Sequence, residues 1–296
     1  PPWRCLEALA GRFAPSPTGP LHQGSLATAL ASYLDARGRS IAWFVRMEDL
    51  DPPRETPGAA ERIKQQCLAH GLIWDAWPCD KGGRADGILY QSDRAGAAGA
   101  YAQALQALIE KAMAFRCQCS RSVLQQVFAN ARALPGSAFF DGERPYPGIC
   151  RNKQLDQGRA WRFKSPEVSE GRGEDDFILQ RADGLWAYHL AVVVDDRWQG
   201  ISRIVRGDDL LPMQTKHGWL QDALELPRPS YQHVPLVVNG QGQKLSKQTK
   251  AKALLTDEKS VRLQLKQATE HLEKTMPSDW LDTVSPAAKA MGLGWG

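Results

Sequence analysis

A strand, a turn rich in proline and glycine, and a helix are expected one after another near the start of the chain. The apolar segment 11–14 leads into Pro15-Ser16-Pro17-Thr18-Gly19-Pro20, and alanine and leucine then recur at helical spacing over residues 24–36. Such a turn suits an anion, because the first amide N–H groups of a helix lack partners within the helix. This order therefore predicts the opening of an α/β nucleotide-binding unit.

The alternation of strands and helices continues along most of the chain. A second strand is expected over residues 39–48, and amphipathic helices over 56–70 and 97–114. After a middle region of short elements, strands are expected at 177–180, 201–206 and 232–238, with helices at 187–195 and 210–224. Asp183-Gly184 predicts a hairpin-like turn between the first of these strands and the first of these helices. This alternation favours a parallel sheet that binds its ligand at the carboxyl ends of its strands.

Composition narrows the classes of protein only a little. The net charge of +4 and the pI near 8.8 permit an RNA or phosphate partner without requiring one. The apolar runs all fall well short of the roughly 20 residues of a membrane helix, and the start of the sequence lacks the apolar core of a signal peptide. We therefore expect a cytoplasmic protein without a membrane partner.

Two constellations could bind a polyphosphate. His22, at the start of the first helix, could donate a hydrogen bond to a phosphate oxygen, with Gly24 and Ser25 beside it. Lys244-Leu245-Ser246-Lys247 follows an expected strand and a glycine-rich loop, where two lysines could neutralise a leaving pyrophosphate. Taken alone, the first could be an ordinary turn and the second a solvated basic loop.

Together the two constellations resemble the HIGH and KMSKS signatures of class I aminoacyl-tRNA synthetases. RFAPSPTGPLHQGSL is similar to the glutamyl and glutaminyl subgroup, and VRMEDLDPPRE, WAYHLAVVVDD, IVRGDDLL and KLSKQ extend the likeness over about 240 residues in the same order. Gln23 and Ser25 depart from the HIGH pattern, so His22 has to act with backbone amides. The resemblance implies a Rossmann-like catalytic domain, catalytic His22 and Lys247, and an ATP–Mg²⁺ site formed by His22, Gly24, Ser25, Lys244, Ser246 and Lys247.

The residues of the amino-acid site can be argued from charge. The side-chain carboxylate of glutamate needs a cationic and preferably bidentate partner, and Arg12 and Arg206 are suited to that role. Glu48, at the end of the second expected strand, could pair with the α-ammonium group. Ser16 and Tyr188 could add hydroxyl hydrogen bonds. Arg206 or Glu48 alone could instead form a surface ion pair, but all five residues match the positions that hold the amino acid in the glutamyl-type enzymes.

The middle of the chain contains a candidate zinc site. Cys117, Cys119 and Cys150 offer three thiolates, whereas structural zinc takes four ligands. Tyr146 is the remaining candidate, and the set resembles the zinc site of truncated glutamyl-synthetase paralogues. The alternative is a group of three reduced, buried cysteines. Cys5, Cys67 and Cys79 are expected to be structural thiols.

We therefore predict four segments. These are the first half of the catalytic domain (1–115), a zinc-binding insertion (116–175), the second half with the KLSK loop (176–250) and a short helical tail (251–296). The 46 residues after Lys250 are too few for the anticodon-binding helical domains of the long enzymes. The resemblance thus implies the short form, a monomer that uses ATP and L-glutamate and loads glutamate onto the queuosine base of tRNA(Asp). The alternatives are a fragment of an enzyme that charges tRNA(Glu), and a catalytically silent RNA-binding paralogue.

Overall fold

The computed structural model describes residues 9–130, 146–169, 172–238 and 252–295. They form two compact units. The first unit comprises residues 1–94, 196–211 and 228–296, and the second comprises 95–195 and 212–227. The predicted insertion 116–175 falls within the second unit, and the predicted domain boundaries remain a prediction.

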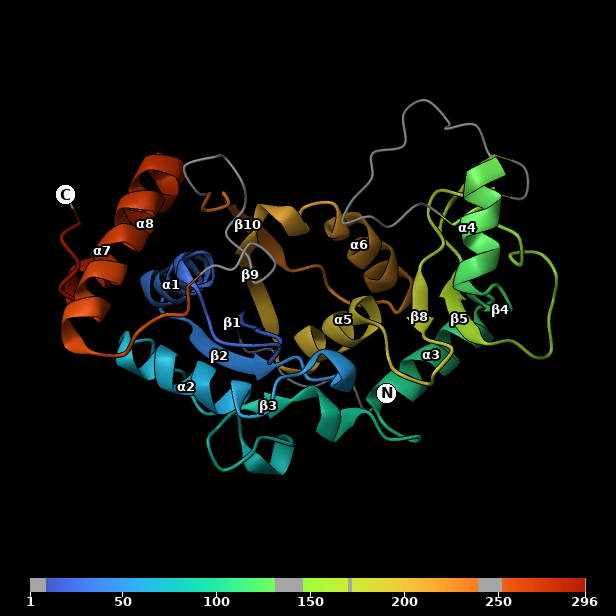
Figure 1. The fold of residues 1–296 in the computed structure, drawn as a ribbon, viewed down its shortest axis with the longest axis horizontal. Coiled ribbons are helices and arrows are strands. Elements are labelled where there is room, and N and C mark those ends of the chain that lie inside the picture. The colour runs from blue at the N-terminus through green and yellow to red at the C-terminus, as the bar shows by residue number, and fades with distance from the viewer. Residues whose placement is uncertain (1–8, 131–145, 170–171, 239–251, 296) are drawn as a thin grey trace. The chain divides into compact units, whose positions relative to one another are not determined.

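A five-stranded parallel sheet forms the centre of the first unit (Figure 1). Its order is β10 (Ser230–Val234), β9 (Ile201–Gly207), β1 (Ala10–Phe13), β2 (Ala42–Met47) and β3 (Leu89–Tyr90), and every neighbouring pair is parallel. The strands are short and mostly buried, as expected where helices cover both faces of a sheet. The predicted α/β fold with a parallel sheet is confirmed.

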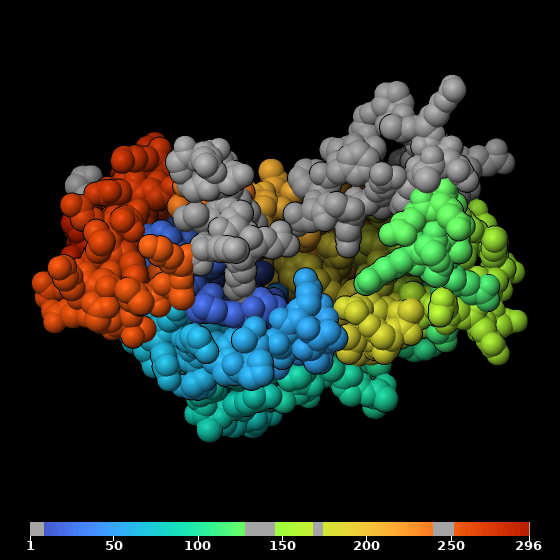
Figure 2. All heavy atoms as spheres, in the orientation of Figure 1, coloured from blue at the N-terminus to red at the C-terminus, as the bar shows by residue number. Residues whose placement is uncertain are grey.

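Among the described residues, four α-helices lie wholly in the first unit. They are α1 (Gln23–Gly38), α2 (Ala59–Ala69), α7 (Glu258–Thr275) and α8 (Ser278–Ala290), and short 3₁₀ turns occupy Pro52–Arg54, Cys79–Lys81, Gln91–Arg94 and Asp208–Leu210. Helix α1 is apolar on most of its surface because the sheet packs on one side and α7 and α8 on the other. Figure 2 shows the orange to red atoms of α7 and α8 at the surface, with blue atoms of the N-terminal part of the chain beside them.

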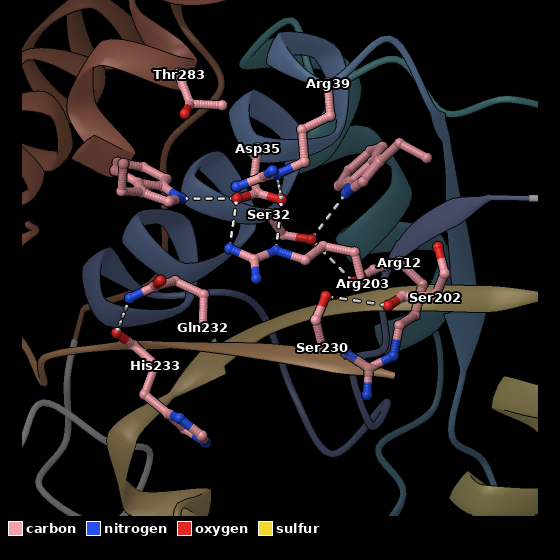
Figure 3. Close-up of polar contacts among 12 residues, drawn as sticks. Arg12, Ser32, Asp35, Arg39, Ser202, Arg203, Ser230, Gln232, His233 and Thr283 are labelled. Carbon is pink, nitrogen blue, oxygen red and sulfur yellow. Dashed lines mark hydrogen bonds and ion pairs between the residues drawn. The ribbon is translucent and has the colours of Figure 1, made fainter. Parts of the chain in front are cut away.

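A buried carboxylate fastens the end of α1. Asp35 accepts two hydrogen bonds from Arg203 of β9, at 3.0 and 3.1 Å, and one of 2.8 Å from the indole of Trp280 in α8. Arg39 adds a bond of 3.1 Å from the next turn of chain (Figure 3). Asp35 therefore joins the helix to the sheet and to the tail.

The second unit is built around an antiparallel sheet. Strands β4 (Ala114–Cys117), β5 (Ala160–Phe163) and β8 (Ile178–Gln180) form it, and β6 (Glu167–Ser169) pairs with β7 (Arg172–Gly173). Its helices are α3 (Ala100–Glu110), α4 (Arg121–Asn130), α6 (Met213–Ala223) and α5 (Tyr188–Trp198), the last three residues of α5 being counted in the first unit. Across the described ranges, no helix combines the length and apolar character that a bilayer crossing needs.

Three sequence expectations are corrected. The strand expected at 177–180 exists as β8, but it belongs to the antiparallel sheet, where the Asp183-Gly184 turn folds the chain back so that Gln180 pairs with Trp186. The last parallel strand is Ser230–Val234 and not 232–238, because Pro235 has no N–H to continue the ladder. The helix expected at 97–114 ends at Glu110, since Ala112 turns the chain with a φ of 54°.

Gly38 provides a test of the packing of α1. A Cβ at Gly38 would lie 2.4 Å from the carbonyl oxygen of Thr283 in α8, which is backbone and cannot move alone. Gly38→Ala gains about 1 kcal/mol in helix propensity but loses about 1–3 kcal/mol to overpacking. We expect a net loss of stability, measured as a lower midpoint of urea unfolding. Gly294→Ala is the control, because its Cβ would meet nothing within 4 Å; equal midpoints for the two variants would contradict the steric argument.

Candidate active site and metal site

His22 caps helix α1. Its backbone is extended, and its Nδ1 accepts a hydrogen bond of 3.2 Å from the amide of Ser25, in the first turn of the helix. Because Nδ1 accepts, the neutral ring carries its proton on Nε2. In this form the His22 ring has its N–H donor on Nε2, and the residue lies at the positive end of a helix, next to Gly24.

The chain returns to this turn after the predicted lysine loop. Lys244, Ser246 and Lys247 lie outside the described residues. Beyond them, Ala253 forms an antiparallel bridge with His22, and the amide of Leu254 donates to the carbonyl of Leu21 at 2.9 Å. The helix start and the segment that follows the lysines in sequence therefore meet side by side.

Arg12, Glu48 and Arg206 belong to one edge of the parallel sheet. Arg12 lies one residue before the end of β1, Glu48 directly after β2, and Arg206 one residue before the end of β9. The order β9-β1-β2 makes these three strands neighbours. The carboxyl ends of parallel strands are where α/β folds bind ligands.

A buried charge network organises this edge, and sequence reasoning missed its centre. Asp196 accepts from Arg12 Nε at 3.0 Å and from Arg46 Nη1 at 2.8 Å, and Arg46 Nη2 also donates to Glu48 at 3.1 Å. The adjacent acids Asp195 and Asp196, after an apolar run, were the available signal for Asp196. The i, i+2 spacing of Arg46 and Glu48, which sets them on one face of the strand, was the signal for Arg46.

The two carboxyl groups of this network differ in their acidity. Burial disfavours the charge of Asp196, but Arg12 and Arg46 outweigh it and lower the pKa of its carboxyl below 3.8. Burial raises the pKa of Glu48 above 4.5, and its ion pair with Arg46 offsets this only in part. Asp196 is therefore the carboxyl group that more readily carries a negative charge. The ionised form of Glu48 would be stabilised by an added cation.

Arg206 has aromatic surroundings. Its guanidinium stacks over the ring of Tyr231, with 4.9 Å from Cζ to the ring centroid, and its Nε donates to His233 Nε2 at 3.4 Å. Burial and the nearby charge of Arg206 lower the pKa of His233, so that ring stays neutral and able to accept. These contacts hold the planar group in one orientation.

The two predicted hydroxyl residues are placed differently. Ser16 is exposed in the turn after β1, where its carbonyl accepts from the amide of Thr18 at 2.8 Å. Tyr188 is the first residue of α5 in the second unit, beside the rings of His189 and His217. The structure therefore brings Arg12, Glu48 and Arg206 to one sheet edge and Tyr188 into the other unit.

The predicted metal ligands converge within the second unit. The Sγ atoms of Cys117, Cys119 and Cys150 all lie within 4.8 Å of one another, and the Tyr146 hydroxyl is 3.4 Å from both Cys117 Sγ and Cys119 Sγ. The Cys119 and Cys150 sulfurs are 3.6 Å apart. Tetrahedral zinc with Zn–S bonds of about 2.3 Å separates its sulfurs by about 3.8 Å. The Cys119–Cys150 separation is close to that value, and the three cysteines form a cluster that could hold a metal ion.

The titration of this cluster is uneven. Burial raises the pKa of the Cys119 thiol to about 11, and it also raises the pKa of the Tyr146 hydroxyl. Burial acts in the same direction on Cys150, but hydrogen bonds from the Tyr146 hydroxyl and the Gln118 backbone lower the pKa of Cys150 below its usual value. The Tyr146 ring is fixed by the guanidinium of Arg162, whose Cζ is 3.9 Å from the ring centroid, and its oxygen accepts from the Cys150 amide at 2.9 Å.

Comparison with known proteins defines the class. The family described as "tRNA synthetases class I (E and Q), catalytic domain" matches residues 8–138 and 165–270. Among solved structures, the chain is similar to the glutamate-tRNA synthetase from Elizabethkingia anophelis, with a TM-score of 0.67 and 28% identity over 82% of this chain. The chain spans about half of that enzyme, 53% of its length.

Curated relatives are more similar. The glutamyl-Q tRNA(Asp) synthetase of Thiobacillus denitrificans is 47% identical over 83% of this chain and 80% of its own length. The protein of the same name from Chromobacterium violaceum is 44% identical over 95% of this chain and 92% of its own length. The chain belongs to the glutamyl-Q tRNA(Asp) synthetase family, within the class I tRNA synthetases for glutamate and glutamine.

The charge network predicts a large effect at Asp196. Asp196→Asn keeps the shape but leaves Arg12 and Arg46 buried without their anion, so we expect a loss of about 3–5 kcal/mol in the free energy of unfolding. Because the Asp196 pKa is lowered in the folded state, the stabilisation is complete above its ordinary value of 3.8 and is lost as pH falls through the lowered value. The Asp196→Asn variant should lack this pH-dependent part of the free energy of unfolding.

Urea unfolding across a pH series measures both effects. Glu258→Gln is the control, because it removes an ion pair with Arg262 whose side chains are 80% and 78% exposed. Such a pair is worth less than about 1 kcal/mol. A loss at Asp196 no larger than the loss at Glu258 would exclude the buried network as a main source of stability.

Proposed function

We propose that this protein activates L-glutamate with ATP and transfers the glutamyl group to the queuosine base in the anticodon of tRNA(Asp). The observation that carries the proposal is the gathering of Arg12, Glu48 and Arg206 at the carboxyl edge of the sheet that leads into His22. The names of the curated relatives support the same substrates.

Glutamate has two carboxylates and one ammonium group, and the carboxyl edge of the sheet has both cationic and anionic side chains that could pair with them. Arg12 and Arg206 would hold the side-chain carboxylate, since a guanidinium has five N–H donors and Asp196 uses only part of those of Arg12. Glu48 would pair with the α-ammonium group, which would in turn favour its ionised form. The hydroxyl of Ser16 would add a hydrogen bond.

Activation is a displacement at phosphorus. The α-carboxylate of glutamate attacks the α-phosphate of ATP, a new O–P bond forms, and pyrophosphate leaves with the electrons of the broken P–O bond. His22 Nε2–H would donate to a phosphate oxygen, with Gly24 and Ser25 at the helix start and Lys244, Ser246 and Lys247 around the leaving pyrophosphate. Mg²⁺ bound with ATP would offset the negative charge of the phosphates.

Transfer uses the acyl-adenylate. A hydroxyl of the cyclopentene diol of queuosine attacks the glutamyl carbonyl, the hydroxyl proton is lost, and AMP leaves. The products are a glutamyl ester of the modified base and AMP, and a covalent enzyme intermediate is not required.

The acceptor is tested by charging with labelled glutamate. We expect glutamate on tRNA(Asp) that contains queuosine, and none on the same tRNA with guanine at that position. Because the proposal assigns recognition to the modified base, an anticodon stem-loop with queuosine should also be charged. Labelling of the 3′-terminal adenosine of tRNA(Glu) would overturn the proposal in favour of ordinary glutamyl-tRNA synthesis, and failure of every RNA to be charged would favour a silent RNA-binding protein.

The second unit is proposed to hold structural zinc through Cys117, Cys119, Cys150 and Tyr146. Protein purified without chelator should contain one Zn²⁺ per chain, with Zn–S distances near about 2.3 Å by X-ray absorption. Tyr146→Phe should weaken zinc binding about tenfold or more, because one of four ligands is lost. Cys79→Ser, which changes an exposed cysteine outside the cluster, should keep the zinc. A zinc-free wild type with three titratable thiols in the cluster would refute the site.

A further inference from the structure

Gln66 of α2 joins the helix-start turn to the segment that follows the predicted lysine loop. Its Oε1 accepts from the amide of Leu21 at 2.8 Å, and its Nε2 donates to the carbonyl of Leu254 at 2.9 Å. Nε2 also lies 3.5 Å from the carbonyl of Leu21, a longer contact. The side chain is 2% exposed, so water does not replace these bonds.

Leu21 and Leu254, the two residues to which Gln66 bonds, lie close in sequence to the two candidate phosphate-binding segments. Leu21 directly precedes His22, and Leu254 stands seven positions after Lys247. The Leu254 amide also donates to the Leu21 carbonyl at 2.9 Å. The Gln66 carboxamide therefore adds side-chain hydrogen bonds to two segments that a backbone hydrogen bond already joins. A carboxamide is suited to this position because it offers a donor and an acceptor on one short planar group.

A second layer supports the same contact. His70 Nδ1 donates to the Gln66 carbonyl at 2.7 Å, so the neutral ring presents Nε2 as an acceptor. The amide nitrogen of Gln264 in α7 must then face His70, at 2.8 Å, and in that orientation its side chain bonds both the N–H and the C=O of Leu255, at 3.1 and 3.2 Å. The backbone carbonyl of Gln264 accepts from Gln23 at 2.9 Å.

We infer that Gln66 is a positioning residue for adenylate formation: its carboxamide keeps the turn at His22 and the segment that follows Lys244–Lys247 in one register. This inference rests on the proposed function. The groups that stabilise a transition state must be aligned within a fraction of an ångström, and misplacement lowers turnover. Glutamate is proposed to bind Arg12, Glu48 and Arg206, none of which contacts Gln66 through a hydrogen bond in the described residues.

The inference predicts a split between kinetic parameters. Gln66→Leu keeps most of the volume and removes every side-chain hydrogen bond, and Gln66→Glu keeps the shape but sets a carboxylate against the Leu254 carbonyl. In ATP–pyrophosphate exchange with L-glutamate, both variants should lose about tenfold or more in kcat and keep KM for glutamate within about twofold. A merely structural role would instead lower the amount of folded protein and leave kcat per folded molecule unchanged.

Gln65→Leu is the matched control, because it makes the same replacement at the preceding, exposed residue of the same helix. It should match the wild type. Circular dichroism and an active-site count would normalise each variant to folded protein. Wild-type kcat in either folded Gln66 variant, or an effect confined to KM for glutamate, would overturn the inference. Absence of glutamate-dependent exchange in the wild type would refute the proposed function itself, so the two failures are distinguishable.

Discussion

The carboxylate of Asp196 lies between two arginines from neighbouring strands, and the site edge of the sheet depends on this arrangement. Arg12 of β1 and Arg46 of β2 are both almost fully buried, and neither could remain there without an anion. The network joins the two strands to the chain that leads into β9 and fixes both guanidinium groups before any ligand binds. Under the proposed function, this preorganisation would let Arg12 and the nearby Glu48 meet a substrate without first being reoriented.

Helix α1 connects the candidate phosphate site at its N-terminus to the rest of the core. Its first turn carries the His22 cap, and its last turns carry Asp35, which holds Arg203 of the sheet and Trp280 of the tail. Helices α7 and α8 pack along it and complete a core that the sheet alone would leave open on that side. The tail thereby stabilises the helix whose N-terminus forms the candidate phosphate site.

Local patterns account for the parts of the fold that could be predicted. The proline- and glycine-rich turn, the helical spacing of alanine and leucine, and the short apolar strands all report on a few consecutive residues, and the parallel sheet followed from their order. The errors arose where a local signal inside the expected element was overlooked, or where a partner distant in sequence decided the outcome. Pro235 ended β10 early, and β8 joined the antiparallel sheet because its cross-strand partners are in β5, which no local pattern reveals.

The amino-acid sequence by itself determined the class of fold, the candidate residues His22, Arg12, Glu48 and Arg206, and the three cysteines with Tyr146 as a possible metal set. Only the tertiary structure decided which charges share a partner: Asp196 lies 184 residues from Arg12 in sequence, and Leu254 lies 188 from Gln66. It also brought the Tyr146 oxygen within 3.4 Å of two thiols. The physical reason is that propensity and periodicity act between near neighbours in the chain, whereas the partner of a buried polar group is whichever residue the folded topology carries to it.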